Sequence, residues 1–148
     1  MKKVVQILLV LVGCAPAALG LAMERYVIPY ISGFLPLKLV GIVFLLVTAL
    51  IAFLGERYLK NTRQVVLLLA LPAFADLVLV LIQRLVLHYY WPGMLGLLSQ
   101  VFYDPLMFLV SSIMFRSSSM PVLYMLCFLV LVLAILAGCK LSRKHRNA

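Results

Sequence analysis

Long apolar blocks, separated only by short basic segments, are the feature that most limits how this chain can fold. Each block has about 17–25 residues, which is the length that an α-helix needs to cross a hydrocarbon core of about 30 Å. The chain is therefore predicted to be an all-α integral membrane protein. The expected transmembrane helices cover about residues 4–23, 38–55, 65–88 and 121–139.

Composition excludes a soluble globular protein. Hydrophobic residues make up 66% of the 148 positions, and the mean hydropathy is +1.20. A soluble domain of this size could not hide so much apolar surface from water. We therefore expect one polytopic membrane domain covering residues 1–148, with no cofactor.

Basic residues flank the apolar blocks. Lys and Arg number 13 against 4 Asp and Glu, giving a formal net charge of +9. Their placement favours anionic lipid headgroups as partners and argues against nucleic acid, because no soluble face remains to bind it. Another membrane protein, or a second copy of this chain, is a further candidate partner.

The distribution of these basic residues also predicts topology. With four spans, the N-terminus, the turn over 56–64 and the tail over 140–148 share one side, whereas a fifth span would separate the turn from the tail. The positive-inside rule therefore favours four spans, with both termini in the cytoplasm. The membrane is expected to be a bacterial plasma membrane. The nine basic residues on that side are Lys2, Lys3, Arg57, Lys60, Arg63, Lys140, Arg143, Lys144 and Arg146.

The segment over 94–116 is ambiguous. It is long enough to span, but Gln100, Asp104 and Pro105 interrupt its middle. Asp104 followed by Pro105 is typical of a helix N-cap and first helical residue. The remaining helix of about 12 residues would be too short to cross. We expect a re-entrant or interfacial hydrophobic helix; a kinked fifth span is the alternative.

The N-terminus resembles a secretory signal, and its Leu11–Cys14 segment resembles a bacterial lipobox. However, the apolar run continues past Cys14 to Ala22, where a lipoprotein would continue into a polar tether. We therefore expect an uncleaved first span without a lipid anchor. The three cysteines lie far apart, mostly within apolar blocks, a pattern that supports neither a metal site nor a disulfide framework.

Asp76 is the most informative polar residue. It lies near the middle of the third block, where an ionised carboxylate costs several kcal/mol. Gln83 shares its helical face two turns later, whereas Arg84 is rotated away. One interpretation is a site for a proton, a cation or a polar ligand, made by Asp76, Gln83 and Arg84. The other is an acid that fixes helix packing by hydrogen bonding to another helix.

A looser set of polar residues lies near the other side of the membrane in the four-span arrangement. Asp104 could pair with Arg84 or Arg116; alternatively the arginines anchor in headgroups and Asp104 only caps a helix. His88 precedes a run of aromatic residues typical of an interfacial belt. The secondary candidates are therefore Asp104, Arg116 and His88.

Small residues at four-residue spacing predict places where helices approach closely. These pairs are Gly13 with Ala17, Ala18 with Ala22, and Ala134 with Gly138.

The sequence contains no nucleophile elbow, P-loop, metalloprotease or dinucleotide-binding motif. The expected function is a non-enzymatic membrane regulator or an accessory subunit that works by contact. The main alternative is a small transporter or channel subunit that uses Asp76. A membrane enzyme built on the region over 88–119 is a weaker third interpretation.

The topology is testable with reporter fusions placed after Arg63 and after Ala148. Both fusions are expected to report the cytoplasm, because the basic residues cluster beside these positions. Opposite locations for the two reporters would contradict four spans and support a fifth span over 94–115.

Overall fold

The computed structural model describes residues 2–27, 34–88, 94–113 and 119–147. Every regular element in this part of the chain is helical, as predicted. Two short π-helical turns, η1 and η2, continue the helices that precede them. In chain order the elements are α1 (Lys2–Gly13), α2 (Ala15–Ala22), η1 (Met23–Val27), α3 (Phe34–Leu59), α4 (Thr62–Leu81), η2 (Ile82–Leu87), α5 (Met94–Val101), α6 (Asp104–Ile113) and α7 (Met120–Asn147).

Within the described residues, four helical stretches are long and apolar enough to cross a membrane. Between the last two lie α5, with 8 residues, and α6, with 10 residues. Neither is long enough to cross a bilayer. The structure therefore confirms four spans with an additional short hydrophobic region, α5–α6, and the described residues of this region form no fifth full span. The four stretches are Lys3–Tyr26, Leu37–Leu59, Thr62–Leu87 and Met120–Arg146.

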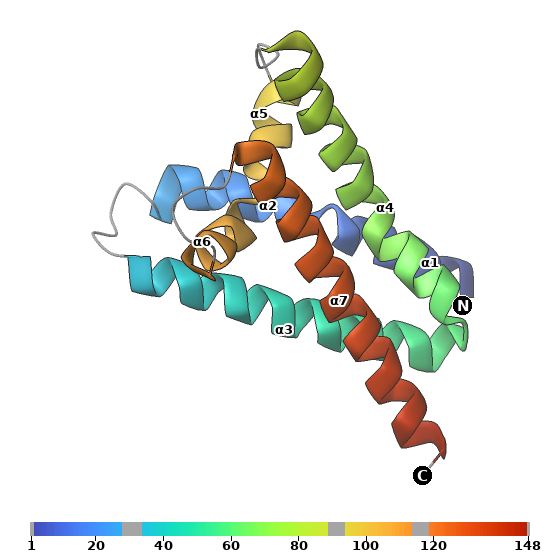
Figure 1. Ribbon diagram of the computed structural model, residues 1–148. Helices are drawn as coiled ribbons and strands as arrows, with labels where there is room; N and C mark the ends of the chain where they lie inside the picture. The colour runs from blue at the N-terminus through green and yellow to red at the C-terminus, as the bar shows by residue number, and fades with distance from the viewer. Residues whose placement is uncertain (1, 28–33, 89–93, 114–118, 148) are drawn as a thin grey trace.

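The helices alternate in direction, as a four-span chain requires. Helices α3 and α7 run in the same direction, since Gly138 lies on Ala49 and, further along both helices, Arg143 lies on Glu56. The two helices cross at an angle (Figure 1). The N-terminus, the turn between α3 and α4, and the C-terminus lie at the same end of the bundle (Figure 1). We call this the basic end, since it carries Lys3, Arg57, Lys60, Arg63 and the basic residues of 140–146.

The turn between α3 and α4 is shorter than the predicted 56–64 segment. Helix α3 continues to Leu59, and α4 begins at Thr62. Lys60 takes a left-handed φ of 55°, and its N–H donates to the Glu56 carbonyl at 2.9 Å, which ends α3. The Asn61 side chain then accepts a 3.3 Å hydrogen bond from the Gln64 N–H and caps α4.

Two of the predicted small residues let helices pack backbone against backbone. A methyl group at Gly138 would overlap the Ala49 carbonyl oxygen, so α7 rests directly on α3. A methyl group at Gly13 would lie 3.0 Å from the Leu69 carbonyl oxygen and 3.1 Å from the Pro72 ring. Pro72 lies inside the continuous helix α4 and lacks the N–H that would bond to the Leu68 carbonyl, and α1 packs against α4 at this point.

The short helices α5 and α6 pack between the long ones. Gly20 allows the α2 backbone to touch the Val101 carbonyl at the end of α5. The fully buried Tyr103, between α5 and α6, donates its hydroxyl to the Ala73 carbonyl of α4 at 2.6 Å. The Tyr103 carbonyl accepts the first helical hydrogen bond of α6, from Met107 N–H at 2.9 Å. Tyr103 is thus the N-cap residue, one position before the predicted Asp104.

The packing of α7 on α3 gives a stability prediction. Gly138→Leu is expected to lower the free energy of unfolding by about 1–3 kcal/mol, because the side chain must displace the backbone at Ala49. Ala137→Leu, on the exposed side of the same helix turn, is the matched control and should change stability by less than about 0.5 kcal/mol. Thermal unfolding in detergent measures both, and equal effects would contradict the close crossing.

Candidate functional site

Asp76 lies in the interior of the bundle rather than against lipid. It is 9% exposed on α4, one turn beyond Ala73, whose carbonyl accepts the Tyr103 hydroxyl. Residues three apart lie on one helical face, so Tyr103 covers the face that carries Asp76. The buried Cys127 thiol of α7 also lies close enough to Tyr103 to interact with it electrostatically. The α5–α6 junction therefore lies beside this carboxyl group, and helix α7 lies next to Tyr103.

One oxygen atom of the Asp76 carboxyl group makes no hydrogen bond in the described part of the chain. Within the described residues, Asp76 Oδ2 is buried and has no hydrogen-bond partner. Burying a polar atom without a partner costs free energy. The interhelical hydrogen bond that the packing interpretation of Asp76 requires is therefore not made by Oδ2.

The second predicted residue, Gln83, takes part in a separate contact. Its side-chain amide donates to the Ser99 hydroxyl at 3.2 Å, and both residues are 1% exposed. This pair ties α5 to the π-helical turn η2, about two turns beyond Asp76. Arg84, the third member of the predicted site, is half-buried in η2. The structure thus assigns Asp76 and Gln83 to different contacts along one helix face.

Two of the secondary candidates, Asp104 and His88, lie away from the basic end of the bundle. Asp104 is the half-buried first residue of α6. Its burial, with a smaller contribution from the nearby Glu24 carboxylate, raises the pKa of the Asp104 carboxyl to about 7. His88 is exposed and ends η2 with a left-handed φ of 56°. Arg116 lies outside the described residues.

Sequence reasoning missed an ion pair at the basic end, between a buried carboxylate and a half-exposed arginine. Glu56 of α3 is fully buried, and its carboxylate accepts hydrogen bonds from Arg143 Nε at 3.2 Å and from the Thr62 hydroxyl at 3.0 Å. A usable indication was present in the spacing: Ala49, Ala52 and Glu56 fall on one face of α3. That face packs on α7, so Glu56 holds α3, α4 and α7 together.

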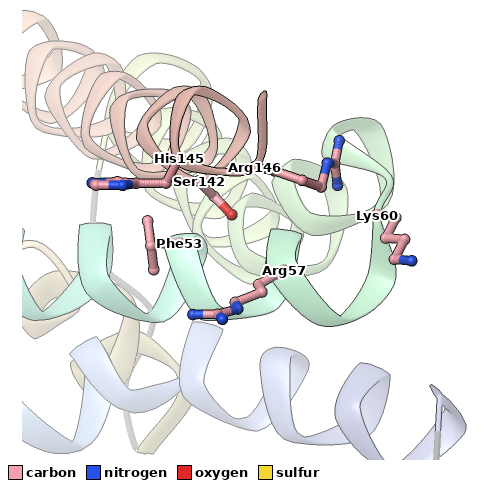
Figure 2. Close-up of a pocket in the computed structure, with 6 residues that line it drawn as sticks. All are labelled: Phe53, Arg57, Lys60, Ser142, His145 and Arg146. Atoms are coloured by element: carbon pink, nitrogen blue, oxygen red, sulfur yellow. The ribbon is translucent and has the colours of Figure 1, made fainter. Parts of the chain in front are cut away.

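A groove opens between α3 and α7 beside this ion pair, with a volume of about 590 Å³. We call it the α3–α7 groove (Figure 2). Its walls combine cationic groups with one hydroxyl and two rings. The residues that line it are Phe53, Arg57, Lys60, Ser142, His145 and Arg146.

Comparison of the chain with models of known families, with curated proteins and with solved structures found no significant match. Functional assignment therefore rests on the geometry of the chain itself. Among the described residues, no three His, Cys, Asp or Glu side chains come together as a metal site would require.

The Glu56–Arg143 pair predicts unequal effects of removing its two partners. Arg143→Met should lower the free energy of unfolding by about 1–3 kcal/mol, because it leaves the Glu56 carboxylate buried with one hydrogen bond fewer. Glu56→Gln should cost less, since the Arg143 side chain is 54% exposed and solvent can replace its partner. Lys144→Met, an exposed change on the same helix, is the control. Unfolding in detergent measures all three, and equal losses for both partners would contradict the asymmetry.

Proposed function

We propose that this multi-pass membrane protein is non-enzymatic and works by contact with other membrane components, as a regulator or an accessory subunit. The proposal rests on the hydrogen bonds that the polar side chains inside the bundle make. Glu56, Gln83 and Tyr103 each join two helices by hydrogen bonds. Polar groups that are used in this way position helices and do not converge on a substrate.

The outer surface of the bundle supports the same proposal. Large apolar side chains point outward along the long helices, with Leu46 65%, Leu50 58% and Leu133 55% exposed. Such surfaces suit lipid or the transmembrane helix of a partner. The connection between α3 and α4 is only two residues long, Lys60 and Asn61, so it leaves no room for an extramembrane domain between them.

A small transporter or channel subunit that uses Asp76 is the second candidate. The unpartnered Asp76 Oδ2, near the middle of α4, is the observation that favours it. A buried acid without a hydrogen-bond partner can bind and release a proton, and intramembrane carboxyl groups of proton pumps and transporters do so. The two candidates differ in whether Asp76 must exchange a proton or a cation.

Proton flux in proteoliposomes separates the two candidates. Purified protein is reconstituted with a pH-sensitive dye inside the vesicles, and an imposed pH gradient is followed for wild type, for Asp76→Asn and for empty vesicles. A contact protein should show no flux above that of empty vesicles, and Asp76→Asn should match wild type. Flux that is present in wild type and lost in a normally folded Asp76→Asn variant would overturn the proposal in favour of transport.

The same residue gives a stability prediction. Asp76→Leu should leave the free energy of unfolding unchanged or raise it by about 1 kcal/mol, because it removes a buried oxygen that has no partner. Thermal unfolding in detergent checks this, with Asp76→Asn as the matched polar variant. A loss of about 1 kcal/mol or more in Asp76→Leu would show that Asp76 makes a stabilising interhelical contact.

A further inference from the structure

The α3–α7 groove is formed by residues that fall on one face of each helix. Phe53 and Arg57 of α3 lie four residues apart, and Lys60 follows directly after the helix; on α7, His145 and Arg146 lie three and four residues beyond Ser142. The residues from the two helices lie on opposite sides of the groove (Figure 2). The groove volume of about 590 Å³ is within the range of small-molecule sites, about 300–1,000 Å³.

The positive charge in this groove is not neutralised by the protein. Arg57, Lys60 and Arg146 all line it. The acidic residue at this end is Glu56, and its carboxylate is already bound by Arg143 and Thr62. The chain has only 4 acidic residues, and the other three lie in the middle of the bundle or toward its opposite end. The groove therefore favours an anionic ligand.

The groove also offers a placed hydrogen-bond donor and an apolar wall. Ser142 is 5% exposed, and its hydroxyl points from α7 toward α3 (Figure 2). The rings of Phe53 and His145 meet edge to face, with centroids 6.2 Å apart, and close one end of the groove. The guanidinium groups of Arg57 and Arg146 extend in different directions from the two helices, so they give the groove positive charge on both walls and do not meet at one point (Figure 2). Ser142 supplies a hydrogen bond that an oxygen atom of a phosphate group can accept.

We propose that the α3–α7 groove binds a phosphate group, with Ser142 as the neutral hydrogen-bond donor and with Arg57 and Arg146 supplying positive charge from the two walls of the groove. Two sources share this chemistry: the headgroup of an anionic phospholipid and a water-soluble phosphate compound. The groove lies where the hydrophobic span of α3 ends, at Leu59, which is the depth of lipid headgroups. This depth, together with the apolar wall at Phe53, favours the lipid source.

Ligand binding by the full-length protein in detergent tests the site, with native mass spectrometry as the measurement. The probes are dioctanoyl phosphatidylglycerol, dioctanoyl phosphatidylcholine and glycerophosphoglycerol, which is the anionic headgroup without acyl chains. The groove variant is Arg57→Gln with Arg146→Gln. The matched control, Arg63→Gln with Lys144→Gln, removes the same charge from the same end but from residues that do not line the groove. Ser142→Ala tests the hydroxyl at constant charge.

Wild type should bind phosphatidylglycerol about tenfold or more tightly than phosphatidylcholine. The groove variant should lose about tenfold or more of that affinity, Ser142→Ala about fivefold, and the control variant less than about threefold. Equal binding of glycerophosphoglycerol and phosphatidylglycerol would support the phosphate site and identify a soluble ligand as its source. Equal losses in the groove and control variants, or unchanged binding by Ser142→Ala, would overturn the proposal. Unfolding temperatures without ligand verify that each variant is folded.

Discussion

Gly138 lets the backbone of α7 rest on the Ala49 carbonyl of α3, and the basic end of the bundle is built on this contact. Further along the same seam, Cys139 Sγ lies 3.8 Å from the Ala52 carbonyl, and Arg143 reaches Glu56. In lipid there is little hydrophobic gain from bringing helices together, so close van der Waals packing and interhelical hydrogen bonds must supply the stability. This seam provides both, and the α3–α7 groove opens beside it.

Polar groups in this chain serve two different purposes. Glu56, Gln83 and Tyr103 are buried and hydrogen-bonded, so they fix how helices meet. Two other polar features do not join helices. Asp76 Oδ2 has no hydrogen-bond partner among the described residues, and the cationic groups of the α3–α7 groove face an open cavity. The two sites lie at different positions along their helices, near the middle of one span and at the end of another. A membrane protein that works by contact can use the second site without any chemistry at the first.

Much of the fold could be predicted because span length and charge placement are local properties of a sequence. Four apolar blocks of sufficient length predicted four crossing helices, and the polar break at Asp104 predicted a short helix there, with an error of one residue at its start. The turn over 56–64 was predicted too long. Charged residues usually mark the end of a span, but Glu56 remains helical because an arginine 87 positions later satisfies its charge inside the bundle.

The sequence by itself determined the class of protein, the number of spans and the end of the bundle that carries the basic residues. Each of these depends only on residues that are close together in the sequence. The sequence also singled out Asp76, because a carboxylate inside an apolar run is visible without a structure. Only the tertiary structure decided that Gln83 bonds to Ser99 rather than joining Asp76, and that Arg57 and Arg146 face one groove. These pairings depend on which helices pack together, and side-chain contacts between distant segments leave no periodic pattern in a single sequence.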